Sequence, residues 1–355
     1  MRPEREVDVS VIVPCRNEIR HIRAFLDSLL RQETAELKVE VVIADGLSHD
    51  GTRQVLADFQ KEHANIHIID NPEKIVSTGA NRAIRQARGE IIIRMDVHTT
   101  YAPDYVRSCV KALKETGAGN VGGPALTSAQ GYIPETIAHG FHAPFATGGA
   151  KFRDPSYEGP VASVPYGCFR KSTLERVGLY DEDLVCGQDV ELNFRITASG
   201  ETVWQSPKIR SWYTPRATFP KLIRQHFQYG FWKIGILRKH RQVLAWRNAA
   251  PATCLLAGLG LLSGLAAADL CGAVALRNAF LIVLLLSASA YVVVSLSAAI
   301  GVARRQGWRF LPVLPVVFAA YQFPYALGSL LALLYRPTLG RAAGPIRKVL
   351  MATSR

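Results

Sequence analysis

Four short stretches of the chain each place a polar or acidic residue directly after an apolar run. They span residues 9–18, 44–52, 94–98 and 187–192 and read VSVIVPCRNE, ADGLSHDGT, RMDVH and GQDVEL. In an open α/β sheet, ligands bind outside the carboxyl ends of the strands. Each stretch alone is a weak signal, but together their order and spacing predict a sheet with one ligand site along its strand ends.

Strand and helix patterns alternate through the first third of the chain. Strands are expected at residues 7–13, 39–44, 66–70 and 90–95, and helices at residues 17–32, 52–63, 77–87 and 103–116. The connections between them are short, which favours an α/β fold with a parallel, doubly wound sheet and helices on both faces.

Residues 117–165 break this alternation because they are rich in glycine, proline and small residues. No regular element is assigned to them, and such a stretch is typical of a loop region that shapes an acceptor site. The pattern resumes with helices expected at residues 171–177 and 189–199, where Gly200 suits the end of the second helix.

The net charge of +13 is unevenly distributed. Up to Glu201 the chain has 28 acidic and 23 basic residues, whereas after Glu201 it has 19 basic residues and a single acid, Asp269. The first part therefore has the composition of an ordinary globular domain. Residues 206–247 are basic and aromatic without an acid, and we expect them to contact anionic lipid headgroups rather than nucleic acid, because apolar segments follow directly.

Three uncharged stretches, residues 248–268, 278–303 and 310–335, are each long enough to cross a hydrocarbon core of ~30 Å. The alternative is three buried helices of a soluble domain, but such helices rarely lack charge over so many residues. The third stretch contains Pro312, Pro315 and Pro324, so it could instead be kinked or re-entrant. The charged residues 1–8 show no signal-peptide pattern.

The six cysteines form neither a CxxC pair nor a Cys/His metal pattern. This usage indicates reduced, mostly structural thiols in a protein that faces the cytosol.

The polar residues at the predicted strand ends match the needs of sugar transfer from a nucleoside diphosphate. The base and ribose must be held, the diphosphate neutralised, and the acceptor hydroxyl deprotonated. Asp45 can accept hydrogen bonds from a uracil N–H or a ribose hydroxyl, and Pro14, Asn17 and Glu18 would line the same pocket. Asp50 is more readily explained as a helix cap.

Asp96 and His98 follow the fourth predicted strand. Residues two apart on an extended segment point the same way, so this carboxylate and imidazole could face one cation and the diphosphate. Oxygen ligands suit Mg²⁺, and an imidazole makes Mn²⁺ more acceptable. The simpler alternative is a turn aspartate beside a surface histidine.

Asp189 begins a predicted helix whose dipole stabilises an ionised carboxylate at its N-terminus. Such a carboxylate could be the general base for an acceptor hydroxyl, or equally a plain helix cap. The local sequence does not separate these two roles.

With these motifs the chain resembles the family 2 glycosyltransferases of the GT-A type, and more narrowly the succinoglycan-biosynthesis type with a C-terminal membrane anchor. The narrower resemblance covers about residues 7–250. Its motifs are Asn71-Pro72, Gly79-Ala80-Asn81-Arg82, Ala87-Arg88-Gly89, Arg94-x-Asp96-x-His98 with Tyr101, Tyr166-Gly167, Phe169-Arg170, Gln188-Asp-Val-Glu-Leu-Asn193 with Arg195, and Arg224-Gln-His-Phe-Gln-Tyr-Gly230 with Trp232-Lys233.

The resemblance implies roles for the matching residues. Asp45, Asn81 and Arg82 would lie on the donor side, Asp96 would lead the metal and diphosphate motif with His98, and Asp189 would be the acceptor-activating base. The residues implied on the acceptor or product side are Gln188, Arg195, Gln225, Gln228 and Trp232. The implied cofactor is Mg²⁺ or Mn²⁺, the implied donor a UDP-sugar, and the implied acceptor a saccharide on a polyprenyl diphosphate lipid.

The chain departs from the family pattern at three positions. His98 replaces the second acid of the D-x-D motif, Gly46 replaces the second acid after the second strand, and Gln188 replaces the glutamate before the base. The Q-x-x-R-W motif of processive synthases is not present, which favours adding one sugar over polymerising many. The leading hypothesis is a membrane-anchored, inverting glycosyltransferase that acts on a lipid-linked acceptor. A processive synthase is one alternative. A catalytically inactive sugar-nucleotide-binding scaffold is another, although Asp45, Asp96 and Asp189 are all present.

We expect four parts: a GT-A catalytic domain at residues 1–205, a basic aromatic segment at 206–247, about three transmembrane helices within 248–335, and a basic tail at 336–355. The positive-inside rule assigns the catalytic domain and residues 304–309 to the cytoplasmic side of the plasma membrane and residues 269–277 to the outside. Three crossings, which we expect, would leave the tail and its five basic residues outside, in conflict with that rule.

Overall fold

Eleven strands form two sheets within the residues that the computed structural model describes, which are 7–34, 36–241 and 245–334. The large sheet contains β1 (Val9–Cys15), β2 (Val39–Asp45), β3 (Ile66–Asp70), β4 (Ile91–Arg94), β6 (Asn120–Gly122), β8 (Gly159–Pro160), β9 (Cys168–Arg170) and β10 (Val203–Gln205). The small sheet contains β5 (Thr99–Tyr101), β7 (Leu126–Thr127) and β11 (Ser211–Tyr213).

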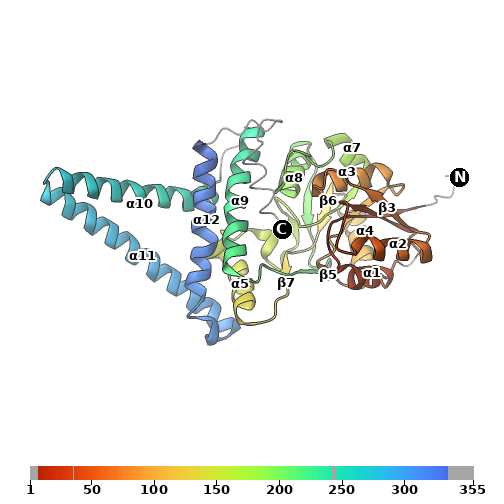
Figure 1. Ribbon diagram of the computed structural model, residues 1–355, viewed down its shortest axis with the longest axis horizontal. Coiled ribbons are helices and arrows are strands. Elements are labelled where there is room, and N and C mark those ends of the chain that lie inside the picture. Colours follow the sequence, from red (N-terminus) through yellow and green to blue (C-terminus); the bar gives the residue numbers. More distant parts are fainter. Residues whose placement is uncertain (1–6, 35, 242–244, 335–355) are drawn as a thin grey trace. The chain divides into compact units, whose positions relative to one another are not determined.

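The large sheet has the order β3-β2-β1-β4-β9-β6-β10-β8 (Figure 1). The four strands expected from the sequence, β1 to β4, are present and pair in parallel. The sequence did not predict β9, which lies antiparallel between β4 and β6. The sheet is therefore mixed, with the expected parallel half.

Helices cover both faces of this sheet, as the doubly wound pattern predicts. The helices α1 (Ile22–Leu30), α2 (Thr52–Glu62) and α4 (Tyr105–Thr116) pack on one face, and α3 (Val76–Gln86), α7 (Lys171–Val177) and α8 (Gln188–Ala198) pack on the other (Figure 1). Along β1, Val11 and Val13 enter the first core and Ile12 enters the second. Alternation of apolar side chains along the strands thus builds two cores.

The chain divides into two compact units. Unit 1 holds both sheets and comprises the residues up to Ser128 together with Lys151–Thr214, including the short η1 helix (Lys151–Arg153). Unit 2 comprises Ala129–Ala150 and the chain from Pro215 onward. Residues 1–6, Tyr335 and the predicted basic tail 336–355 lie outside the described residues.

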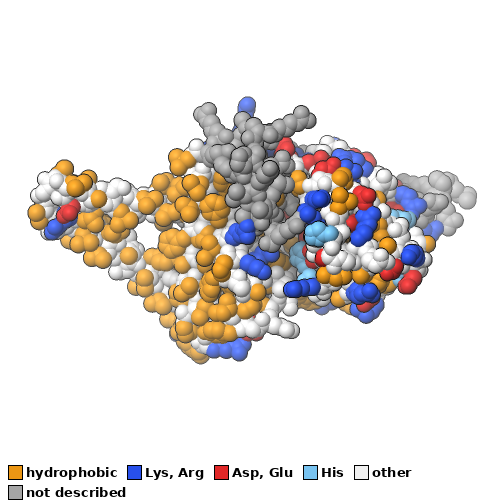
Figure 2. Space-filling view, in the orientation of Figure 1, with side chains coloured by type: hydrophobic (Ala, Val, Ile, Leu, Met, Phe, Trp, Pro, Cys, Tyr) orange, Lys and Arg blue, Asp and Glu red, His pale blue; other side chains and the backbone are white. Residues whose placement is uncertain are grey.

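Unit 2 is helical. It contains α5 (Tyr132–His142), α6 (Pro144–Thr147), α9 (Phe219–Lys239), α10 (Trp246–Leu270), α11 (Val274–Gln306), η2 (Trp308–Phe310) and α12 (Leu314–Leu334). Three of these helices, α10, α11 and α12, are long and apolar enough to cross a membrane, as the sequence predicted. Figure 2 shows apolar side chains spread over α10 and α11.

Residues 129–150 fall in the stretch that the sequence left unassigned and inside the range expected for the catalytic domain. They form α5 and α6, which pack within unit 2 against α12. The Tyr321 hydroxyl donates to the Ile137 carbonyl at 3.0 Å, and the Phe145 and Phe318 ring centroids lie 5.5 Å apart. This insertion therefore belongs with the apolar helices.

Candidate active site

The strand order brings the predicted site residues to one edge of unit 1. Strands β2, β1 and β4 are neighbours, and their carboxyl ends carry the segments with Asp45, Glu18 and Asp96. Asp189, at the start of α8, reaches the same edge through a contact with Arg94 at the end of β4. The four stretches that the sequence singled out therefore do converge in space.

The loops after β1 and β2 are joined by hydrogen bonds. The Asn17 N–H donates to Ser48 Oγ at 2.8 Å, and the His49 N–H donates to Asn17 Oδ1 at 3.1 Å. The Glu18 N–H donates to Thr52 Oγ1 at 2.8 Å. Because the backbone of residues 17–19 bonds to this second loop, α1 begins at Ile22 rather than at residue 17 as expected. Pro14 is half-buried within β1 beside this loop pair.

Asp45 holds the loop that follows β2. Its side chain is fully buried and accepts hydrogen bonds from Ser48 Oγ at 2.5 Å and Arg53 Nη1 at 3.0 Å. The sequence led us to expect this carboxylate to face a nucleoside, but in the structure its oxygens face Ser48 and Arg53. Asp50 accepts from the Thr52 N–H at 3.1 Å in the turn before α2, but the N-cap residue of α2 is Gly51, so Asp50 precedes the cap rather than forming it.

Arg94 lies at the centre of the strand-end cluster. Its guanidinium, only 4% exposed, donates to both oxygens of Asp96 at 3.1 and 3.3 Å and also donates to Asp189 Oδ1. Burial lowers the pKa of Arg94, but the charges of Asp189 and Asp96 outweigh burial and raise that pKa well above its ordinary value. Arg94 is therefore a fixed cation between two carboxylates.

Asp189 lies in the first turn of α8, as the sequence predicted. Loss of surrounding water raises the pKa of its carboxyl, Arg94 opposes this effect, and the charge of Asp96 adds to it, so that the pKa lies above the usual range. A carboxylate with a raised pKa is a stronger base than an ordinary aspartate. Gln188, half-buried, is the first residue of the same helix.

Asp96 and His98 lie in a turn rather than on an extended segment, since the Thr99 N–H donates to the Asp96 carbonyl at 3.2 Å. Asp96 accordingly contacts Arg94, whereas His98 Nδ1 lies 3.3 Å from Glu18 Oε1. The turn means that alternate spacing does not point the two side chains the same way, and a cation shared by Asp96 and His98 stays a prediction.

The donor atoms near these residues still have a chemistry that suits Mg²⁺ or Mn²⁺. Asp96 and Glu18 are 19% and 22% exposed and supply carboxylate oxygens, and His98 is about half exposed. Among the residues that the structure describes, however, no group of three or more His, Cys, Asp or Glu side chains is arranged to hold a metal ion. A cation here would need diphosphate oxygens as further ligands.

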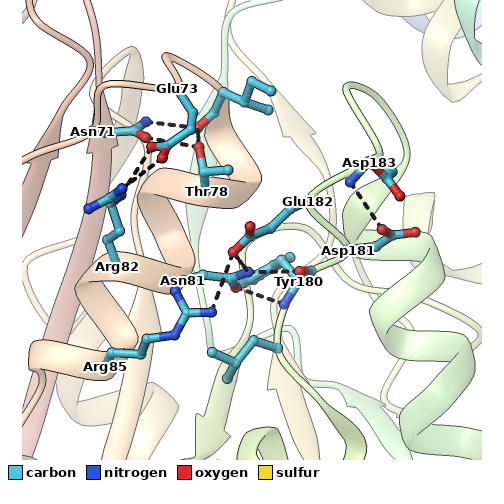
Figure 3. A network of polar contacts seen from close by, with 12 residues as sticks. Asn71, Glu73, Thr78, Asn81, Arg82, Arg85, Tyr180, Asp181, Glu182 and Asp183 are labelled. Atoms are coloured by element: carbon cyan, nitrogen blue, oxygen red, sulfur yellow. Dashed lines mark hydrogen bonds and ion pairs between the residues drawn. The ribbon is translucent and has the colours of Figure 1, made fainter. Parts of the chain in front are cut away.

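Asn81 makes contacts within the protein that the sequence did not predict. Its amide donates to the Tyr180 carbonyl and to Glu182 Oε1, both at 2.8 Å, and accepts from the Tyr180 N–H at 2.8 Å (Figure 3). The side chain is buried, so Asn81 fixes the loop before α8 rather than facing a donor. Arg82, one residue on, forms an exposed ion pair with Glu73 at 2.7 Å (Figure 3).

Arg195, expected on the acceptor side, also has a structural role. Its guanidinium pairs with the buried Glu191 at 2.7 Å and donates to the carbonyls of Val177, Gly178 and Leu179 at 2.5 to 2.6 Å. These bonds satisfy carbonyl groups at the end of α7. Asn81 and Arg195 thus anchor the segment from residue 177 to 182, which leads to Asp189.

Comparison with known proteins decides the family. Residues 10–178 match the family model for Glycosyl transferase family 2. The chain is 32% identical over 243 residues to the succinoglycan biosynthesis protein ExoA of Rhizobium meliloti (strain 1021), which covers 68% of this chain and 73% of that protein. The chain is a family 2 glycosyltransferase.

Two further similarities agree with this result. The glycosyltransferase is 28% identical over 246 residues to the dolichyl N-acetyl-alpha-D-glucosaminyl phosphate 3-beta-D-2,3-diacetamido-2,3-dideoxy-beta-D-glucuronosyltransferase of Methanococcus voltae, over 67% of this chain and 76% of that protein. Its fold is similar to that of mannosyltransferase PcManGT from Pyrobaculum calidifontis, with a TM-score of 0.58, 20% identity, and coverage of 92% and 88% of the two chains. The protein is therefore a GT-A glycosyltransferase of glycan biosynthesis.

Three residues of the glycosyltransferase that were expected on the acceptor side, Gln225, Gln228 and Trp232, lie on α9 in unit 2. Gln228 and Trp232 are buried, and Gln225 donates to the Tyr229 hydroxyl at 3.0 Å. Their expected role remains a prediction.

The sequence analysis named Arg94 within a motif but assigned it no role. Its position could have indicated a role, because a charged residue that ends an apolar strand is buried and a buried charge requires partners. Tyr101 was missed in the same way: it is buried, and its hydroxyl accepts from the Asp96 N–H at 2.7 Å. Tyr180, whose ring centroid lies 5.5 Å from the Arg94 guanidinium carbon, gave no signal in the sequence.

Proposed function

We propose that the glycosyltransferase is an inverting, membrane-anchored enzyme that moves one sugar from a nucleoside diphosphate sugar to a lipid-linked saccharide. The observation that carries this proposal is the Arg94 guanidinium between Asp96 and Asp189. This guanidinium links Asp96, which we expect beside the diphosphate, to Asp189, which we expect to act as the base.

In the proposed reaction, Asp189 takes the proton of the acceptor hydroxyl while that oxygen forms a bond to the anomeric carbon. The bond from the anomeric carbon to the diphosphate oxygen breaks, and the nucleoside diphosphate leaves with the electron pair. A single displacement inverts the anomeric configuration. Arg94 keeps Asp189 and Asp96 at a fixed separation, so the base and the leaving group are held in register.

The donor would be held by the loops after β1 and β2. Asn17, Glu18 and the Asp45-anchored loop would line the nucleoside, with a UDP-sugar as the expected donor. Asp96, with Glu18 and His98 nearby, would share a divalent cation with the diphosphate. Such a cation, when bound, neutralises the charge that develops on the leaving group.

The membrane part of the proposal rests on α10, α11 and α12. The name of the Methanococcus voltae relative describes a transferase that acts on a dolichyl phosphate saccharide, and PcManGT was solved with GDP-Man and Mn²⁺. These relatives support a lipid-linked acceptor and a nucleotide-sugar donor. Basic residues before α10 support a cytoplasmic active site at the plasma membrane, in contact with anionic lipids.

A screen of radiolabelled sugar nucleotides on membranes that contain the full-length protein tests this function. We expect one donor to label material that organic solvent extracts, with loss of labelling in EDTA and recovery with Mn²⁺ or Mg²⁺. Label that appears only in free oligosaccharide, or transfer that EDTA leaves unchanged, would contradict the lipid-linked acceptor or the cation, respectively.

A further inference from the structure

The three apolar helices differ in how they expose their side chains. Within the most apolar window of each helix, 6% of α10 and of α11 is buried, against 44% of α12. Exposed large side chains on α11 include the near-consecutive residues Leu281, Ile282, Val283, Leu285 and Leu286, which point to all sides of a helix. A helix with this pattern is surrounded by lipid.

The exposed apolar side chains of α12 form one stripe instead. Apart from Leu333 next to the helix end, its large exposed residues are Val316, Phe323, Leu327, Leu331 and Leu334, whose spacing of seven, four, four and three keeps them on one face. The other faces of α12 are covered by protein. This pattern fits a helix that lies along a bilayer surface and equally one that crosses within a helix bundle, and the charge of its partner helix separates the two.

One cover of α12 is α9, which runs parallel to it. The His226 and Tyr321 ring centroids lie 4.4 Å apart near the start of the contact. Twelve residues further along α9, Arg238 donates to the carbonyls of Ala332 and Leu333 at 2.6 and 2.9 Å. The two helices therefore share one direction, and any tilt of α12 relative to the bilayer is also the tilt of α9.

The two backbones touch where glycines face each other's carbonyl groups. A Cβ atom on Gly230 of α9 would lie 2.0 Å from the Tyr325 oxygen, and one on Gly328 of α12 would lie 2.1 Å from the Phe227 oxygen. Because even a single added carbon atom would clash at these positions, the two backbones are in direct contact and no lipid fits between them. The pair is therefore one rigid element.

α9 carries too much charge to cross a bilayer. Each Lys or Arg near the centre of a crossing helix strongly disfavours its insertion. Its longest run without a cation is residues 225–232, about 12 Å, against a hydrocarbon core of ~30 Å. The cations of α9 are Lys221, Arg224, Lys233, Arg238 and Lys239.

The exposed apolar side chains of α11 form a belt along that helix, and this belt indicates how deep α9 and α12 lie in the bilayer. Large exposed apolar side chains on α11 run from Val274 to Leu296, about 34 Å at 1.5 Å per residue, and then stop ten residues before the helix ends. Tyr291 of α11 donates to Gln322 of α12 at 2.9 Å. Since Tyr291 precedes Leu296 by five residues, the middle of α12 is about 8 Å from the edge of the belt, which is the depth of an interfacial helix.

We propose that α10 and α11 make the only two crossings within the described residues, and that α9 and α12 lie together in the headgroup boundary of the leaflet that faces the active site. The apolar stripe of α12 contacts the acyl chains, and the α9 cations contact anionic headgroups. This inference rests on the membrane anchoring proposed above. It replaces the expectation of three crossings: with two crossings the carboxyl end of α12 lies on the catalytic domain's side, and the sequence that follows is basic, as the positive-inside rule asks of that side.

Accessibility labelling of the full-length protein in sealed membrane vesicles tests this topology. Cys186, Cys254 and Cys271 are replaced, the buried core cysteines are kept, and single reporters are restored at native Cys271, Gln306→Cys or Leu334→Cys. We expect a membrane-impermeant maleimide to label positions 306 and 334 from the same side and position 271 from the opposite side. Labelling of 334 from the same side as 271 would show three crossings and overturn the inference.

The same labels separate this inference from the proposed function. If 306 and 334 both lie outside and 271 inside, the interfacial α12 is retained and the cytoplasmic active site is lost. As a second measurement, a fluorophore on Leu327→Cys should be quenched most by lipids with shallow quenchers. A matched fluorophore on Leu285→Cys in α11 should be quenched most by lipids with deep quenchers. Deep quenching at both positions would also overturn the inference.

Discussion

Arg94 is the residue on which both proposed catalytic carboxylates depend. Lysine at this position would keep the positive charge but not the planar fork that reaches Asp96 and Asp189 together. We therefore expect Arg94→Lys to lower kcat roughly 10- to 100-fold with a small change in the KM for the donor, since displacement by about 1 Å has costs of this order. Arg107→Lys on α4, at an exposed ion pair with Glu33, is the matched control and should retain full activity.

The pH profile separates catalytic positioning from a loss of structure. A base works deprotonated, so the rate falls as the pH drops through the pKa of Asp189, which lies above the usual aspartate range. Arg94 opposes that rise, so Arg94→Gln should move the acidic limb of kcat/KM to higher pH, whereas Arg94→Lys should leave it in place. An unmoved limb in Arg94→Gln would assign Arg94 a structural role alone.

Asp96 and His98 are expected to differ in their effect on donor binding. We expect Asp96→Ala to weaken binding of the nucleoside diphosphate and Mn²⁺, and His98→Ala to weaken it less, because His98 contacts Glu18 and is about half exposed. Calorimetric titration with and without Mn²⁺ measures both variants. His63→Ala, just before the amino end of β3, is the control. Metal-independent binding of normal strength in both variants would refute the cation site.

Sequence reasoning grouped Glu18, Asp45 and Asp96 because each lies at or just after the end of a strand, and parallel neighbouring strands end at one edge. It could not separate residues that face a ligand from residues that hold the protein together. Asn81 contacts Tyr180, 99 residues later, and Asp45 is occupied by Ser48 and Arg53. Such partners depend on the tertiary fold, so the motif alone assigned Asn81 and Asp45 to the donor.

At the level of elements, the contact between α9 and α12 depends on Gly230. An added methyl group there would meet the Tyr325 carbonyl, whereas at Gly235 of the same helix nothing lies within 4 Å of it. We expect Gly230→Ala to cost about 1–3 kcal/mol by overpacking. Gly235→Ala should be neutral or stabilising by up to about 1 kcal/mol, because alanine favours a helix. Thermal unfolding of the full-length protein in detergent compares the two variants. Equal unfolding midpoints would contradict the close contact.

The helices and strands with strong periodicity were predictable, including β1 to β4 and α8. The elements that were missed are short or depend on distant partners. β9 has three residues and lies between β4 and β6, and α5 and α6 gain their apolar cover from α12, more than 170 residues later. Local composition therefore showed only a glycine-rich stretch where the insertion lies.

At the scale of the whole molecule, unit 1 is a mixed α/β unit that contains Asp45, Asp96 and Asp189, and unit 2 is a helical unit that contains the apolar helices α10 and α11. Charge and hydropathy predicted both parts, because their compositions differ sharply on either side of Glu201. The number of crossings was not predictable in this way. The two crossings that we propose rest on the pairing of α12 with the charged α9, whereas hydropathy scores each helix separately.

The most direct test of the proposed mechanism is the transfer rate of Asp189→Asn in the full-length, membrane-embedded enzyme, measured alongside its donor affinity. Asparagine has the same shape but is not a base, so we predict a loss of roughly 10²–10⁴ in transfer rate with donor affinity within about threefold of the native value. Near-normal turnover by this variant would remove Asp189 from the role of base and contradict the account of the active site.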